Sequence, residues 1–195
     1  QWPVMSLSLK AVEGNDFSTA YMQLVYEVGE LFKKHEYLME SPVLNAEEKR
    51  KFDDIRYGRA GKIEVMRSLQ ILSEFLSKYY NKSVILLIDE YDVPMARATS
   101  NGYYKEMLEI MKGFMQALKD NQCIKLAVIT GCLKIAKESI FTGTNNFVSN
   151  TITSSRLNEY YGFVQNEVDR ILEDAEIKGK GDIMKKWYDG YHFGD

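Results

Sequence analysis

Five consecutive apolar residues followed by two acids constrain the fold of this chain more than any other feature. Residues 84–88 (VILLI) form the run, and Asp89 and Glu90 follow directly. The turn-prone residues 81–83 precede it. A short apolar run bounded in this way is typical of a strand covered on both faces, as in the middle of a parallel sheet. The segment therefore predicts a buried strand with two carboxylates at its carboxyl end.

Strand-like and helix-like segments alternate along the first 130 residues. Asn15 and Asp16 can cap a helix, and Asn45 with Glu48 has the pattern of a capping box. Apolar periodicity predicts helices at residues 17–32, 46–57, 62–80 and 104–118. Strands are predicted at residues 3–9, 84–88 and 124–130. A loop is expected through Pro94 and Gly102. We expect residues 62–80 to form the longest helix. The alternation predicts an α/β fold with a mostly parallel sheet flanked by helices on both faces.

The pattern weakens after Gly131. Residues 148–152 are expected to form a short strand, and residues 165–175 and 182–188 are expected to form helices. We therefore divide the chain into a core at residues 1–153 and a small C-terminal helical appendage of the same domain at residues 154–195.

Composition excludes several classes of protein. The 195 residues include 45% hydrophobic residues, and the net charge is only -3, so a general electrostatic attraction to nucleic acid or anionic lipid is not expected. Cys123 and Cys132 are too few and too isolated for a disulfide framework or a four-ligand zinc site. No apolar run reaches the roughly 18 to 20 residues that span a bilayer, and no signal peptide is evident. We predict a cytoplasmic protein without a membrane partner and without direct nucleic-acid binding.

The two acids after the apolar run are the candidate catalytic residues. Ligands of parallel α/β sheets bind at the carboxyl ends of the strands, where Asp89 and Glu90 are placed. In P-loop ATPases, an acid at this place holds Mg²⁺ and the next acid orients or deprotonates the attacking water. Asp89 fits the metal role and Glu90 the catalytic role. The alternative is that both acids end a strand and simply contact solvent.

Two further residues lie near the same edge of the predicted sheet. Thr130 ends the next strand and is the candidate contact to the nucleotide, where its hydroxyl could sense the γ-phosphate or position water. The alternative is a hydroxyl bonded to local backbone at a glycine turn. Asp92 is interpreted as a turn former, with a supporting acid of the site as the second possibility.

A phosphate-binding loop is missing from these residues. Such a loop needs G-x-x-x-x-G-K-[ST] between a strand and a helix, because its N–H groups surround the phosphates. Residues 61–63 (GKI) follow a helix, lack the hydroxyl residue and have Arg56 in place of the first glycine; residues 179–182 (GKGD) fail for the same reasons.

Other candidate sites are weaker. His35 and His192 have no metal-ligand spacing. Residues 176–178 (EIK) match half of a nuclease signature but are not expected on a strand. The aromatic residues between 187 and 193 are interpreted as packing at a helix end, with a docking surface or a stacking platform as the alternatives.

The chain resembles the AAA-ATPase-like family of bacterial proteins, many of which join this domain to a restriction-endonuclease-like nuclease domain. Segments spread along nearly the whole chain carry the resemblance in their order and spacing. They are residues 3–10, 84–92, 130–131, 133–141, 145–146, 161–163 and 187–191. Lys134, where an arginine is expected, and Val164, where a threonine is expected, depart from the family pattern.

The resemblance implies an incomplete P-loop NTPase-like core that uses ATP and Mg²⁺. It implies that the phosphate-binding loop and the central strand that feeds it lie upstream of Gln1. The full-length parent would then be an ATPase that acts on neighbouring domains, among them a nuclease domain, whereas this fragment alone would be inactive. The alternative is a non-hydrolysing interaction scaffold with a nucleotide-binding fold.

Overall fold

The computed structural model describes residues 2–119, 121–132, 147–151, 153–157, 160 and 162–188. Contacts group the chain into two compact units, residues 1–144 and 145–195. The division at residue 153 that we drew from the sequence stays a prediction.

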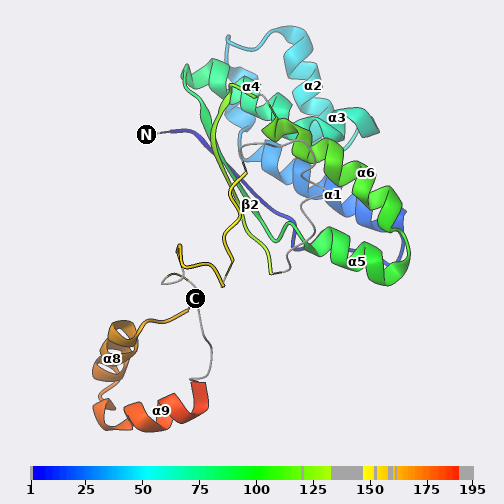
Figure 1. Cartoon of the computed structure of the whole chain (residues 1–195). Helices are drawn as coiled ribbons and strands as arrows, with labels where there is room; N and C mark the ends of the chain where they lie inside the picture. Colours follow the sequence, from blue (N-terminus) through cyan, green and yellow to red (C-terminus); the bar gives the residue numbers. More distant parts are fainter. Residues whose placement is uncertain are drawn as a thin grey trace. The chain divides into compact units, whose positions relative to one another are not determined.

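The first unit is built on a sheet of three parallel strands (Figure 1). The strands are β1 (Val4–Ser8), β2 (Val84–Asp89) and β3 (Ile124–Ile129), in the order β1-β2-β3. Leu86 in the central strand lies opposite Met5 of β1 and Ala127 of β3. The register shifts by one residue near the start of β3, where Lys125 is the extra residue. The prediction of an α/β fold with a parallel sheet is confirmed.

Helices connect the strands and lie on one side of the sheet (Figure 1). Contacts of α1 with β1 and of α4 with β2 attach this layer to the strands. Between β1 and β2 the helices are α1 (Phe17–Lys33), α2 (Ala46–Arg56), α3 (Lys62–Met66) and α4 (Ser68–Tyr80), with the 3₁₀ turn η1 (Glu36–Glu40); between β2 and β3 they are α5 (Val93–Asn101) and α6 (Tyr104–Met115), with the 3₁₀ turn η2 (Gln116–Leu118). The second unit contains α8 (Gln165–Asp174), η4 (Lys178–Lys180) and α9 (Gly181–Tyr188), close to the two helices expected there.

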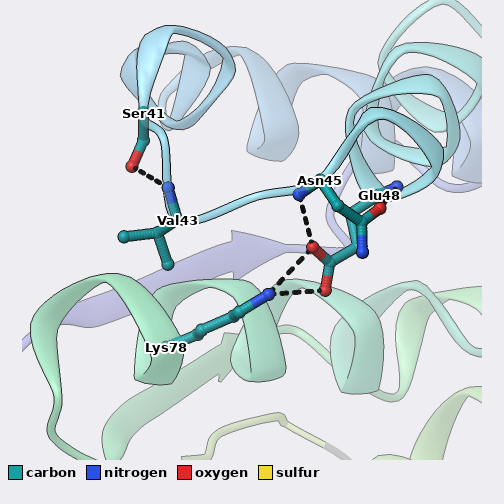
Figure 2. A network of polar contacts seen from close by, with 5 residues as sticks. All are labelled: Ser41, Val43, Asn45, Glu48 and Lys78. Carbon is teal, nitrogen blue, oxygen red and sulfur yellow. Dashed lines mark hydrogen bonds and ion pairs between the residues drawn. The ribbon is translucent and has the colours of Figure 1, made fainter.

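Side-chain caps begin two of these helices as predicted. The Asp16 carboxylate accepts the Thr19 N–H at 2.8 Å and starts α1. At the start of α2, the side chains of Asn45 and Glu48 each accept the other's backbone N–H, which is a complete capping box. Glu48 also accepts two hydrogen bonds from the Lys78 ammonium on α4, at 2.9 and 3.1 Å (Figure 2). One cap therefore also holds α2 and α4 together.

Residues 62–80 do not form one helix, contrary to the prediction. Arg67 leaves the helical region (φ -97°, ψ 3°) and separates α3 from α4. The two pieces have different partners, because α3 contacts α6 whereas α4 contacts β2. The apolar period continues through the break, so the sequence pattern does not reveal it. With 17 residues, α1 is longer than either piece.

Two other expectations were wrong. The segment through Pro94 and Gly102 is the helix α5 and not a loop. Proline is tolerated in the first turn, where its missing N–H would have no acceptor, and Gly102 ends the helix with φ 81°. Residues 147–151 form no strand in the structure, and residue 152 lies outside the described residues.

The two faces of the sheet differ in exposure. On the covered face, the side chains of β1 and β2 are at most 3% exposed; they are Met5, Leu7, Val84, Leu86 and Ile88. On the open face, four large apolar side chains are 37% to 53% exposed; they are Val4, Leu87, Leu126 and Val128. We expected helices on both faces from the sequence. In the described part of the first unit, they pack on the covered face.

Candidate functional site

The carboxyl ends of the three strands bring polar residues from distant parts of the chain together. Ser8 pairs in register with Asp89, and Thr130 follows Ile129, whose partner is Ile88. The side chains of Ser8, Asp89 and Thr130 are exposed at this edge. The structure therefore places Asp89 and Thr130 beside each other, at the edge where the sequence predicted them. We call this group of strand ends the carboxyl edge.

One oxygen of the Asp89 carboxylate is already hydrogen-bonded. Oδ1 accepts the hydroxyl of Thr130 and, at 3.0 Å, the backbone N–H of Glu90. Among the described residues, Oδ2 receives no hydrogen bond. An exposed carboxylate oxygen of this kind is a hard ligand that suits Mg²⁺, which keeps several of its own waters and needs only one or two protein carboxylates. The residues present fit a magnesium ion.

Glu90 has an unusual backbone conformation. Its φ is 54°, in the left-handed region that residues other than glycine seldom adopt. Its N–H is bonded to Asp89, and its carbonyl accepts the Val93 N–H at 3.2 Å. Strain of this kind persists only where the surroundings hold it, and it occurs most often at functional sites. The turn at Glu90 therefore follows directly on the end of β2 at Asp89.

Asp92 is a buried residue and not merely a turn former. It is 4% exposed and stands at the N-cap position of α5. Its Oδ1 accepts the backbone N–H of Cys132, beyond the end of β3, at 3.3 Å. The Tyr91 N–H also donates to the Thr130 carbonyl at 3.1 Å. Sequence reasoning missed this link, for which the only available signal was a third acid, two residues after Glu90.

Neither glycine-lysine pair forms a phosphate cradle. Gly61 is the N-cap of α3, and its N–H is bonded to the Glu64 side chain at 3.0 Å. Gly179 and Lys180 lie in the 3₁₀ turn η4. In the described residues, neither pair stands between a strand and a helix, as the sequence predicted.

The remaining candidates lie away from the carboxyl edge or outside the described residues. His35 Nδ1 is 3.2 Å from the Tyr37 hydroxyl, and burial, with a smaller effect of the Lys34 charge, lowers the pKa of His35. Trp187 and Tyr188 on α9 are 79% and 76% exposed. Residues 176–178 are not in a strand. Several residues of the quoted motifs lie outside the described residues; they are Lys134, His192 and residues 133–141, 145–146, 161 and 189–193.

A pocket of about 280 Å³ opens on the helical layer. Its lining comes from α1 and the end of α2, with the Tyr26 and Tyr57 rings and the charged groups of Lys33 and Arg56 among it. None of its lining residues belongs to the carboxyl edge, so it contributes nothing to the chemistry of Asp89 and Glu90.

Neither a metal site built from protein groups alone nor a membrane-spanning helix occurs among the described residues. Within the described residues, no group of three or more His, Cys, Asp or Glu side chains could hold a metal ion by itself. No helix in the described ranges is both long and apolar enough to cross a membrane.

Comparison with known proteins identifies one family. The family model described as "Predicted AAA-ATPase" matches residues 1–141. The chain is also 28% identical over 113 residues to a protein of Azotobacter chroococcum mcd 1 described as "Uncharacterized protein in vnfD 5'region". That match covers 56% of this chain and 22% of the relative. No solved structure matches the chain.

Proposed function

The chain belongs to the predicted AAA-ATPase family, and on this premise we propose that it is the part of an ATP-binding and hydrolysing module that supplies the acids for magnesium binding and water activation. The juxtaposition of Asp89, Glu90 and Thr130 at the carboxyl edge supports this proposal most. Because the chain spans only 22% of its curated relative, the activity of a whole protein is part of the proposal.

Each residue has a distinct task in this proposal. Asp89 would hold Mg²⁺, and Oδ2 is the oxygen available for it, because Oδ1 is bonded to Thr130 and to the Glu90 N–H. The ion would neutralise charge that develops on the phosphates of ATP. Glu90 accepts the proton of the attacking water, as a general base must lie beside its reactant. Thr130 donates its hydroxyl hydrogen to Asp89 and so orients that carboxylate. Its hydroxyl oxygen would still accept a hydrogen bond from a water beside the nucleotide.

The phosphates need a cradle of backbone N–H groups, which neither Gly61 nor Gly179 provides. We propose that a loop elsewhere in the parent protein supplies it. ATP turnover would then drive a conformational change in neighbouring domains, among which a nuclease domain is one candidate.

The decisive test is Glu90→Gln in the protein that carries this chain together with its phosphate-binding loop. We expect Mg²⁺-dependent ATP turnover to fall about 100- to 10,000-fold, because a general base is lost, whereas nucleotide affinity stays within a few-fold. Glu106→Gln, an exposed acid on α6, is the matched control and should leave turnover unchanged. Unchanged turnover in Glu90→Gln would refute the assignment.

The isolated chain provides a second measurement. Calorimetry should detect little or no ATP binding, because the phosphate contacts are absent. Micromolar binding by residues 1–195 alone would show that a cradle exists here after all.

A non-hydrolysing interaction scaffold is the second candidate function. The exposure of Trp187 and Tyr188 on α9 favours it, since exposed aromatic groups are typical of docking surfaces. The sequence preceding this chain in its parent discriminates between the two functions. A strand ending in Gly-Lys-Ser or Gly-Lys-Thr supports the ATPase, and its absence supports the scaffold.

A further inference from the structure

We propose that Asp92 is a positioning residue, which locks the loop after β3 against the loop after β2 and thereby holds the Thr130 hydroxyl on Asp89. The link between the two loops is supported by hydrogen bonds and close contacts in the structure and does not depend on the proposed function. Its effect on turnover rests on the proposed function.

Three contacts cross between the two loops in succession. The Thr130 hydroxyl donates to Asp89 Oδ1, the Tyr91 N–H donates to the Thr130 carbonyl at 3.1 Å, and the Cys132 N–H donates to Asp92 Oδ1 at 3.3 Å. Thr130 is therefore held through both its side chain and its carbonyl. The third contact, from the Cys132 N–H to Asp92, follows two residues later. Among the three acceptor residues, Asp92 is the most buried, with only 4% of its surface exposed, whereas Asp89 and Thr130 are exposed.

Gly131 shows how closely the loops approach. A Cβ atom added to this glycine would overlap Asp92 Oδ1 and would lie 2.7 Å from Cδ1 of the Tyr91 ring. Both distances are too short for real Cβ atoms, so the Asp92 and Tyr91 side chains would have to shift to admit a side chain here. Gly131, which has no side chain, therefore allows the two loops to pack this closely.

The link also fixes the strained turn at Glu90. On one side, the Glu90 N–H is bonded to Asp89; on the other, the Asp92 carbonyl accepts the Ala96 N–H at 2.9 Å and begins α5. The Asp92 side chain connects the start of α5 to the loop after β3 through its hydrogen bond with the Cys132 N–H. A left-handed Glu90 needs both sides held, because residues other than glycine adopt this conformation only where their surroundings hold it. Without Asp92, both Thr130 and Glu90 would lose their alignment.

Asn121 offers a matched control at the opposite end of β3. Its Oδ1 accepts the Cys123 N–H at 2.9 Å, and its Nδ2 donates to Ser73 Oγ at 3.0 Å. Asn121 and Asp92 therefore each bind a backbone N–H next to one end of β3. Only Asp92 does so beside the acids.

The first experiment measures amide hydrogen exchange by NMR in the chain itself, without nucleotide. Asp92→Ala should speed exchange of the Tyr91 and Cys132 amides at least about tenfold, and Asp92→Asn, which keeps the acceptor oxygen, should restore most of the protection. Gly131→Ala should have the same effect as Asp92→Ala while leaving Asp92 in place. Asn121→Ala should leave these two amides unchanged. Equal exchange rates in Asp92→Ala and the wild type would overturn the link.

The second experiment measures ATP turnover in the parent protein. Asp92→Ala should lower kcat about 10- to 100-fold with KM changed less than about threefold, as expected when reacting groups are misplaced and binding is retained. Asp92→Asn should recover kcat to within about threefold of the wild type, and Asn121→Ala should not lower it. Equal losses in Asp92→Asn and Asp92→Ala would overturn the positioning role. A wild-type protein without turnover would refute the proposed function, and the exchange measurement would still decide the link.

Discussion

Two adjacent leucines of β2 have opposite environments. Leu86 is 0% exposed on the covered face, whereas Leu87 is 37% exposed on the open face. The neighbouring strand repeats the difference, with Met5 at 0% and Val4 at 43%. Residue type therefore does not distinguish the two faces, and the difference must arise from how the chain is connected.

The direction of the connections explains the difference. Both crossovers, from β1 to β2 and from β2 to β3, step the same way along the sheet. Connections between parallel strands are almost always right-handed, so two steps in one direction put both sets of helices on one face. Cover for the open face has to come from outside these two crossovers. An apolar strand thus indicates that burial of both its faces is favourable. It does not indicate which segment of the protein covers each face.

The largest expected effect comes from truncating the two leucines separately. Leu86→Ala should destabilise the fold by about 3 kcal/mol, because it removes buried methyl groups and leaves a cavity. Leu87→Ala should cost about 1 kcal/mol or less, because its side chain already contacts solvent. Urea unfolding measures both. Equal losses would mean that the open face is covered in solution.

A smaller effect is expected in the helical layer over the covered face. Gly29 on α1 faces the end of α2, and an added Cβ would lie 2.8 Å from the Arg56 carbonyl oxygen. Alanine normally stabilises a helix relative to glycine by about 1 kcal/mol. Gly29→Ala should instead destabilise the fold by about 1 to 2 kcal/mol, because α1 and α2 must separate.

Thermal unfolding of Gly29→Ala, with the exposed Gln23→Ala on the same helix as control, checks the sign of this effect. A variant more stable than the wild type would show that the helices adjust without cost.

The smallest effect concerns the contact between α2 and α4. Burial raises the pKa of Glu48, but the Asn45 N–H and the Lys78 ammonium lower it more, so the net pKa is below the ordinary 4.5. Its contribution to stability is present above pH 4.5 and is lost as the pH falls through the lower folded value. Glu48→Gln should cost less than about 1 kcal/mol at pH 7, since the pair is partly exposed.

Urea titrations at pH 7 and at pH 3 test this contact. The difference in stability between the wild type and Glu48→Gln should shrink at the lower pH. A difference that does not change with pH would assign the effect to the cap geometry and not to charge.

Much of the candidate site followed from local sequence. The apolar run ending at Asp89 predicted a strand, and parallel strands share one carboxyl edge, so Thr130 was expected beside the acids. The link between Asp92 and Cys132 was not predictable, because it joins residues 40 positions apart through a backbone N–H that has no sequence signature. The left-handed Glu90 was equally hidden, since its residue type does not favour that conformation.

The sequence by itself determined most of the elements, two of the helix caps and the order in which strands and helices follow one another. Apolar periodicity and the capping residues Asp16 and Asn45 act over only a few residues. The tertiary structure decided which face of the sheet the helices cover, where residues 62–80 break at Arg67, and how closely Gly131 approaches Asp92. These features depend on contacts between segments distant in sequence, whose geometry is set by the handedness of the crossovers and by close packing.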